Sequence, residues 1–291
     1  MLDRILGIFL PVLAVVLLGF GYGRRMRPDM TWVNRISMQV LAPALVFSAL
    51  ASKSFDVGAS KLLMLASVGV VLGSGLLAWP VARFMKVSAR TFVPPTMFNN
   101  CGNMGLPLAV LAFGDAGFPP MVALFTISNL LHFTLGVWIV DHHARIGTLM
   151  RTPIVLATLA GFAFAIVHPP LPEWLGTAIR MVGDALVPLM LLSLGVRLAE
   201  VPWSDWRVGV VGGVACPVTG MLMAAILAPV LGLDPTQTGL LMLFGCLPPA
   251  VLNFMVAEQF RQEPARVASI VLIGNTLAIL FVPLGLTIAL H

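Results

Sequence analysis

Residues 94–107 read PPTMFNNCGNMGLP and interrupt an apolar run that extends from residue 92 to residue 113. The stretch contains three prolines, two glycines and three asparagines, and both glycine and proline cost stability in a helix interior. Inside a bilayer, non-helical backbone survives only where protein or a water-filled cavity covers its polar groups. We therefore expect a broken transmembrane helix beside a cavity near the middle of a membrane.

The composition of the whole chain indicates a membrane protein. Of its 291 residues, 59% are hydrophobic and only 10% are charged, whereas about a quarter of the residues of a soluble domain are charged. So few charges exclude a soluble enzyme, and we interpret the net charge of +5 as a sign of membrane topology and not of a nucleic-acid partner. Cys101, Cys216 and Cys246 lack the spacing of a metal site, so we expect neither a metal nor another cofactor.

Apolar runs between charged or turn-rich breaks predict an all-α polytopic membrane protein with ten transmembrane helices. The runs lie roughly at residues 5–23, 32–51, 61–81, 92–113, 119–140, 153–168, 175–196, 208–231, 237–257 and 265–290. Loops after odd-numbered spans carry twelve Lys and Arg residues and the opposite side carries three. The positive-inside rule then places both termini outside the cytoplasm. The twelve are Arg24, Arg25, Arg27, Arg83, Lys86, Arg90, Arg145, Arg151, Arg197, Arg207, Arg261 and Arg266, and the three are Arg4, Lys53 and Lys61.

The chain divides into two five-span halves, residues 1–140 and 153–291, joined by a short cytoplasmic loop at residues 141–152. Polar and proline positions recur in both halves, and an odd number of spans makes the second half enter the membrane from the opposite side. The matches are Arg35, Gln39, Pro43 and Ser48 with Arg180, Asp184, Pro188 and Ser193; Pro94, Pro95 and Asn99 with Pro248, Pro249 and Asn253; and Asn129 with Asn275. The sequence therefore predicts an inverted repeat, with broken crossover helices in spans four and nine.

The two breaks predict where a ligand binds. We expect the helices to break at Pro94, Pro95, Pro107, Pro248 and Pro249, with Pro107 in the first turn of a new half-helix and Asn103 as its cap. Helix N-termini that face one cavity favour an anion. Because no Lys or Arg lies at the breaks, amide and backbone N–H groups are the expected donors to a carboxylate. The candidate binding residues are Asn99, Asn100, Gly102, Asn103, Gly105, Asn253, Asn129 and Asn275.

Three further residues are candidates for coupling transport to a proton. Arg180 and Asp184 are spaced to pair on one helix face, either as a structural ion pair or as a proton-coupling site. His132 lies three residues after Asn129, where it serves either as a proton relay or as a hydrogen-bonded packing residue.

The residues NNCGNMGLP at 99–107, together with the proline-broken fourth and ninth spans, resemble the signature of the auxin efflux carrier family. The resemblance implies a transport domain that carries the crossed helices, a scaffold domain through which homodimers form, and alternating access between the two domains. It also implies small organic anions as substrates, either auxin-type acids or dicarboxylates such as malate or malonate. Because the central loop is short, compact bacterial members are the closer comparison, which implies a bacterial inner membrane with periplasmic termini.

Sodium-coupled symport, a passive channel and an intramembrane enzyme are alternatives to this function. The chain is distantly similar to the bile acid sodium symporters, which implies sodium-coupled symport as an alternative, although no carboxylate falls beside either break. A passive channel is disfavoured because no charged ring or filter-like repeat occurs. The motifs of intramembrane enzymes are also missing, so we expect a carrier and not an enzyme.

Overall fold

The structure, a computed structural model, describes residues 2–52, 57–142, 151–199 and 205–290. These residues form helices and short connections, with one isolated antiparallel β-bridge between Asn99 and Pro249. Six helical stretches are long and apolar enough to cross a membrane, namely Thr31–Leu50, Ser60–Phe84, Asp115–Val140, Glu173–Val196, Trp206–Leu231 and Pro264–Ala289. The chain is thus an all-helical, multi-pass membrane protein.

Each of the ten predicted segments coincides with helical structure. The first half contains α1 (Leu2–Met26), α2 (Thr31–Ile36), η1 (Ser37–Leu41), α3 (Ala42–Leu50), α4 (Val57–Phe84), α5 (Ala89–Met97), η2 (Cys101–Gly105), α6 (Leu106–Phe113), η3 (Asp115–Gly117), α7 (Phe118–Leu131), η4 (His132–Gly136) and α8 (Val137–Val140). The second half contains α10 (Pro153–Val167), α11 (Glu173–Asp184), α12 (Leu186–Leu198), α13 (Trp206–Leu231), α14 (Pro235–Cys246), α15 (Leu252–Gln259) and α16 (Pro264–Ala289). The apolar runs therefore predicted where the helices lie.

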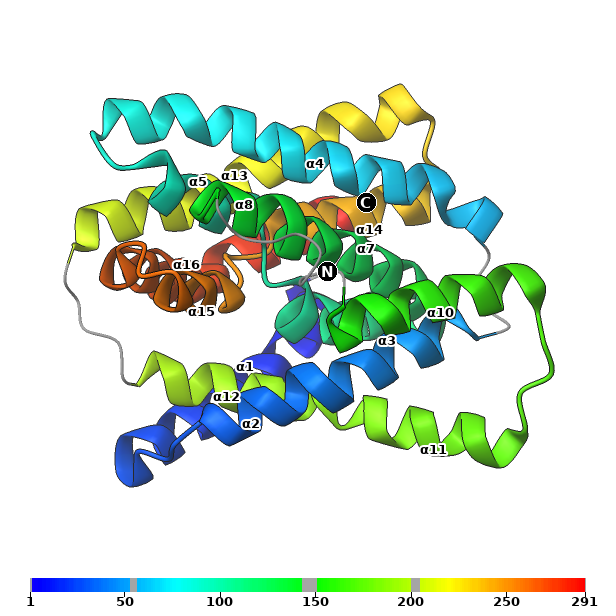
Figure 1. The fold of residues 1–291 in the computed structure, drawn as a ribbon. Coiled ribbons are helices and arrows are strands. Elements are labelled where there is room, and N and C mark those ends of the chain that lie inside the picture. Colours follow the sequence, from blue (N-terminus) through cyan, green and yellow to red (C-terminus); the bar gives the residue numbers. More distant parts are fainter. Residues whose placement is uncertain (1, 53–56, 143–150, 200–204, 291) are drawn as a thin grey trace.

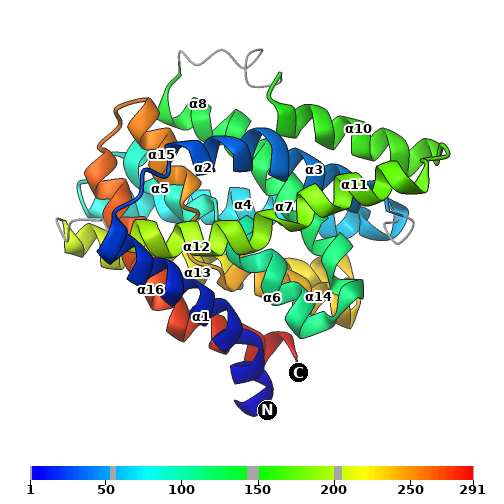
Figure 2. The same ribbon diagram turned by 90° about the horizontal axis from the view of Figure 1, so that it is seen from below.

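Many of the helices fall into two groups (Figure 1). One group contains α1, α3, α10, α11 and α12, in which α1 packs along α12 and α3 packs against α10 and α11. The other contains α4, α5, α13, α14 and α16, in which α13 packs along α4, α14 and α16. In Figure 2, α1 and α16 lie side by side, and the start of α1 and the end of α16 lie near each other.

Glycines allow close approach of helices in both groups. A Cβ atom added to Gly19 of α1 would lie 2.2 Å from the carbonyl oxygen of Leu192 in α12. A Cβ atom added to Gly220 of α13 would lie 2.2 Å from the carbonyl oxygen of Gly245 in α14. Between apolar helices in lipid, attraction depends on van der Waals contact, which small residues bring to backbone range.

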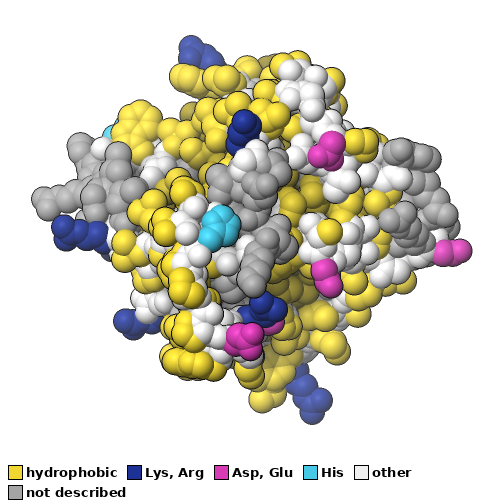
Figure 3. Space-filling view, turned by 90° about the vertical axis from the view of Figure 1, so that its right-hand side faces the viewer, with side chains coloured by type: hydrophobic (Ala, Val, Ile, Leu, Met, Phe, Trp, Pro, Cys, Tyr) yellow, Lys and Arg dark blue, Asp and Glu magenta, His cyan; other side chains and the backbone are white. Residues whose placement is uncertain are grey.

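The outer surface of the molecule is apolar. Leu76 of α4, Ile166 of α10 and Val230 of α13 are among the large hydrophobic side chains that point outward, with exposed fractions of 69%, 69% and 73%. Figure 3 views the end of the molecule where the α10–α11 and α13–α14 connections lie, and hydrophobic side chains are widespread even there, with a few charged ones among them. Such extensive apolar exposure is unfavourable in water but is what a lipid-facing surface requires.

The connections alternate between two ends of the molecule. In Figure 1 the α1–α2, α4–α5 and α15–α16 connections lie at the left, and the α10–α11 and α13–α14 connections lie at the right. Arg24 and Arg25 occupy the last turn of α1, and Arg83 occupies the last turn of α4. Arg261 lies between α15 and α16. These basic residues therefore gather at the same end of the helices.

Candidate functional site

Two helices are broken, and the breaks cross. Phe98–Asn100 leave the helical conformation between α5 and η2, and residues 247–251 do so between α14 and α15. The Asn100 N–H donates to the carbonyl of Pro248 at 2.7 Å, and the Ala250 N–H donates to the carbonyl of Phe98 at 2.9 Å. These antiparallel bonds satisfy backbone groups that neither helix can satisfy alone, as the low-dielectric interior demands.

The side chains of Asn99 and Asn253 also stabilise the crossing. Asn253 Nδ2 donates to the carbonyl oxygens of Phe98 and Ala250, both at 2.9 Å. Asn99 Nδ2 donates to the carbonyl oxygen of Phe244 at 2.5 Å. The side-chain oxygens of both amides are buried and have no partner among the described residues. Each amide is thus oriented by its nitrogen, with its oxygen left as an unused acceptor.

Asn100 and Asn275 connect the crossing to α16. Asn275 Nδ2 donates to the carbonyl oxygens of Pro249 and Val271, at 2.9 and 2.8 Å. Asn275 Oδ1 accepts a hydrogen bond of 3.0 Å from Asn100 Nδ2. Because the donors and the acceptor of the Asn275 side chain are all occupied by protein, this residue positions the crossing.

The structure corrects two details of the predicted break. Pro94 and Pro95 lie inside α5, which continues to Met97. A proline lacks an N–H but keeps its carbonyl, and the Phe98 N–H still donates to the Pro94 carbonyl at 3.0 Å. The break therefore falls after these prolines, whereas Pro248 and Pro249 lie in the second break itself.

The second correction concerns Asn103. Helical structure after the first break begins with the π-helical turn η2 at Cys101, so Asn103 lies inside a helix and forms no cap for α6. Pro107 lies at the start of α6, but α6 continues η2, so Pro107 is not in the first turn of the new half-helix as the sequence predicted. With Asn99 bridged to Pro249, Asn103 and Asn253 each follow the bridge by four residues. These two amides therefore occupy the same position relative to the bridge, whereas the sequence comparison paired Asn99 with Asn253.

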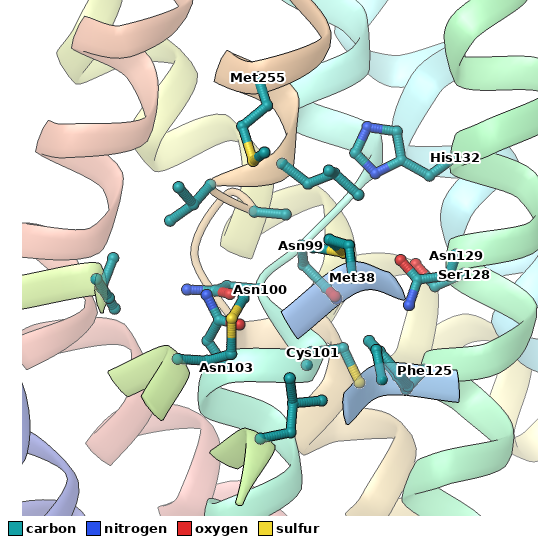
Figure 4. A pocket seen from close by; sticks show the side chains of 18 of the residues that line it. Met38, Asn99, Asn100, Cys101, Asn103, Phe125, Ser128, Asn129, His132 and Met255 are labelled. Carbon is teal, nitrogen blue, oxygen red and sulfur yellow. The ribbon is translucent and has the colours of Figure 1, made fainter. Parts of the chain in front are cut away.

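A cavity of about 60 Å³ lies beside the crossing (Figure 4). One side is formed by the crossing, α7 and the start of α15, and the other by η1, α3 and α12. None of the described lining residues is Asp, Glu, Lys or Arg. Its polar lining residues are Asn99, Asn100, Asn103, Ser128, Asn129, His132 and Ser193, and its apolar lining includes Met38, Phe125, Met190 and Met255.

The cavity contains five of the eight predicted binding residues. Asn99, Asn100, Gly102, Asn103 and Asn129 line it, whereas Gly105, Asn253 and Asn275 do not. A Cβ atom added to Gly105 would lie 2.8 Å from a side-chain carbon of Leu247, so this glycine allows the two breaks to approach each other. Asn253 and Asn275 hold the crossing through the hydrogen bonds described above.

Free polar groups remain in the cavity. The side chains of Asn103 and Asn129 form no hydrogen bond within the described residues, and Figure 4 shows them on different sides of Asn99. His132, the predicted coupling residue, stacks on Phe98 with ring centroids 4.2 Å apart and planes 2° apart. Its Nε2 is buried and has no partner among the described residues.

Arg180 and Asp184, the other coupling candidates, lie outside the cavity. Both are exposed on α11, and no ion pair joins them within the described residues, which corrects the predicted pairing. Asp184 is the last residue of α11, and a turn at Ala185 precedes α12. Exposed side chains gain little from pairing, so helical spacing alone did not bring these two together.

Sequence reasoning missed several cavity residues. Ser128 precedes Asn129, and Ser193 is in the repeated pattern of span seven, so both had a weak signal. The methionines Met38, Met190 and Met255 had none, because an apolar residue in an apolar span is not distinguished by its sequence. Among the cysteines, Cys101 lines the cavity, whereas Cys216 and Cys246 are buried without lining it.

Comparison with known proteins places the chain among transporters. Residues 143–286 match the family model described as "Membrane transport protein". A Rhizobium meliloti protein named "Putative malonate transporter" is 27% identical over 303 residues, which cover 95% of this chain and 93% of that protein. An "Uncharacterized transporter" of Methanothermobacter thermautotrophicus is 26% identical over 290 residues, which cover 94% and 95% of the two chains. The similarity therefore extends over almost the whole chain.

Proposed function

Because the chain is a membrane transporter of the family whose model it matches, and not an enzyme, we propose that it is a secondary carrier of small organic anions. The substrates are carboxylates, either dicarboxylates or auxin-like acids, and the name of the Rhizobium meliloti relative favours malonate as the first compound to test. The anion binds in the cavity beside the crossing and leaves on the other side of the membrane by alternating access.

The observation that carries this proposal is a cavity lined by amides and free of charged side chains. An anion in a low-dielectric site needs hydrogen-bond donors to replace its hydration. Asn103 and Asn129 offer N–H₂ groups that no described residue uses. The N-terminal end of the η2–α6 helix also lies at the cavity, where its partial positive charge favours an anion. Neutral donors bind an anion without trapping it, which suits a carrier.

The position of the cavity supports alternating access. Met38 and Met190 come from the α1, α3, α10–α12 group and its η1 turn, and Asn99 and Asn103 come from the crossing. A site between two helix groups opens to either side when one group moves against the other. We assign the group containing α1 and α12 as the scaffold, through which two chains associate, and the group containing the crossing as the transport domain.

The proposal includes a topology of ten spans in two inverted repeats, residues 1–140 and 153–291. It is supported by the antiparallel crossing of the two breaks and by Asn103 and Asn253, which each follow the bridge by four residues. The basic residues at one end of the helices support periplasmic termini in a bacterial inner membrane.

Counterflow in proteoliposomes tests the proposal. Vesicles loaded with unlabelled malonate should transiently accumulate external labelled malonate. The binding site of a carrier faces one side of the membrane at a time, so it carries labelled malonate in as it returns from carrying unlabelled malonate out. The assay is repeated with malate and with an auxin-type acid, and each is run with and without sodium. Equilibration without transient accumulation would identify a channel, and an absolute requirement for sodium would favour the sodium-coupled alternative.

A further inference from the structure

One oxygen in the cavity wall is held as a hydrogen-bond acceptor. Asn99 Nδ2 donates to the carbonyl oxygen of Phe244 at 2.5 Å. Rotating this amide by 180° would bring two oxygens together, so the assignment of nitrogen and oxygen is fixed by the contact. Asn99 lines the cavity and is 9% exposed, and its Oδ1 has no partner among the described residues. An unused buried acceptor is costly, and a donor on the ligand would satisfy it.

His132 supplies a second group of this kind. It is 2% exposed, lines the same cavity, and its Nε2 has no partner among the described residues. The ring is held flat against Phe98. In the tautomer that carries its proton on Nδ1, Nε2 is an acceptor.

The cavity therefore presents both donors and acceptors, without a charge to balance a second negative charge. His132 and Cys101 are the titratable side chains among the described lining residues. Among the described side chains of the helices that supply the walls, the charged one is that of Glu258 in α15, which is exposed and outside the cavity. A dianion would place a carboxylate against Asn99 Oδ1 with no cation nearby, which is strongly unfavourable in a buried site.

We infer that the cavity takes an organic monoanion that carries a hydrogen-bond donor in addition to its carboxylate, so that a dicarboxylic acid is bound in its singly protonated form. The inference rests on the proposed function and specifies its substrate. The carboxylate accepts from the amides of Asn103 and Asn129, and the remaining carboxyl O–H donates to Asn99 Oδ1. The molecule that crosses the membrane therefore carries one negative charge and one proton of its own.

Three ligands test separately whether binding depends on the ligand's hydrogen-bond donor and on its net charge. Malonamate is a monoanion whose amide donates at every pH, monomethyl malonate is a monoanion without a donor, and malonate loses its donor when its second carboxyl ionises. Binding to the purified full chain in lipid nanodiscs is measured by calorimetry across pH in sodium-free buffer. Malonamate should bind about tenfold or more tightly than monomethyl malonate, because a site built around a ligand donor rejects analogues that lack it. The affinity for malonate should fall about tenfold per pH unit above its second pKa.

Malonamate also serves as the control for titration of the protein. It has one carboxyl, so any pH dependence of its binding reports His132 or Cys101, and the difference between malonate and malonamate reports the proton of the ligand. Asn99→Ala should bring the affinities for malonamate and monomethyl malonate close together. His132→Phe keeps the ring stack on Phe98 but removes Nε2, and it provides a second variant if Asn99→Ala does not fold.

Each alternative result has a definite meaning. Equal binding of malonamate and monomethyl malonate to the unmodified protein would overturn the inference, as would undiminished binding of malonate at high pH. Binding that requires sodium, and loses the requirement in Asn99→Ala, would assign Asn99 Oδ1 to a cation and would also overturn it. Binding of none of the three probes, with or without sodium, would overturn this inference, and the proposed function would then fail only if counterflow with malate and with an auxin-type acid failed too. Equal binding of all three overturns the inference and leaves the proposed function standing.

Discussion

Asn103 differs from the other amides at the crossing because the protein does not use its side chain. It lines the cavity and forms no hydrogen bond within the described residues. We predict that Asn103→Ala weakens carboxylate binding by about 1–3 kcal/mol, the typical cost of an unmet buried polar group, while the thermal unfolding midpoint changes little. Asn103→Asp, which keeps the size but places a negative charge in the cavity, should abolish binding. Calorimetry and thermal melts of the same preparations check both; unchanged affinity in Asn103→Ala would place the anion elsewhere.

Asn275 should behave in the opposite way. Its amide donates to two carbonyl oxygens and accepts from Asn100, and truncation leaves these groups buried without a partner. We predict that Asn275→Ala destabilises the protein by about 1–3 kcal/mol, seen as a lower unfolding midpoint, with loss of transport as a consequence of a displaced crossing. A normal midpoint combined with lost binding would mean that Asn275 contacts the substrate directly.

The contrast between these two residues marks what sequence could predict at this scale. The density of Pro, Gly and Asn predicted a break near residues 94–107, and the crossing lies there. It could not predict the partner of each amide, because Asn99 and Asn100 bond to groups 145 and 175 residues away. Asn103 and Asn275 each follow a glycine, and only tertiary contacts separate a free amide from an occupied one.

At the scale of elements, the turns of η1, η2 and η4 are π-helical, and each contributes a residue to the cavity lining. These residues are Met38 in η1, His132 in η4, and Cys101, Gly102 and Asn103 in η2. A π-turn inserts one residue into a helix and is frequent at functional sites. The spans were predicted from apolar runs, and one inserted residue does not change whether a run is apolar. The helices were therefore predicted and these π-helical turns were not.

The contact of α1 with α12 depends on glycine. A Cβ atom added to Gly19 would lie 2.2 Å from the Leu192 carbonyl oxygen, and backbone cannot yield as a flexible side chain does. We predict that Gly19→Ala lowers stability by about 1–3 kcal/mol, as is typical of overpacking. Gly21→Ala on the same helix is the matched control, because a Cβ atom there meets nothing within 4 Å. Thermal melts in detergent compare the two, and equal midpoints would show that α1 and α12 separate freely.

At the scale of the whole molecule, the sequence predicted the helical segments but not how they group. Hydropathy reports that a segment is apolar on most sides, which is as true of α1 as of α13. The close glycine contacts, such as Gly19 with Leu192 and Gly220 with Gly245, decide which helices share a group. The contact of Gly19 with Leu192 joins helices far apart in the chain, so a single sequence shows the glycine but not its partner.

The proposed inverted repeat makes a prediction about three positions at once. An even number of spans places both termini on one side of the membrane, and an odd number in each half places the loop at residues 141–152 on the other. Arg145 and Arg151 in this loop favour the cytoplasm, although residues 143–150 lie outside the described part of the chain. A reporter that is active only in the periplasm should therefore be active when fused after His291 and inactive when inserted after Gly147.

A second reporter, active only in the cytoplasm, should give the reciprocal pattern at the same two positions. At each position the predicted result is that one reporter is active and the other is inactive. A misfolded fusion would leave both reporters inactive, so misfolding cannot produce this result. Activity of the same reporter at both positions would mean that the second half contains an even number of spans. In that case the two halves could not be inverted, and the antiparallel pairing of Asn99 with Pro249 would require an origin other than an inverted repeat.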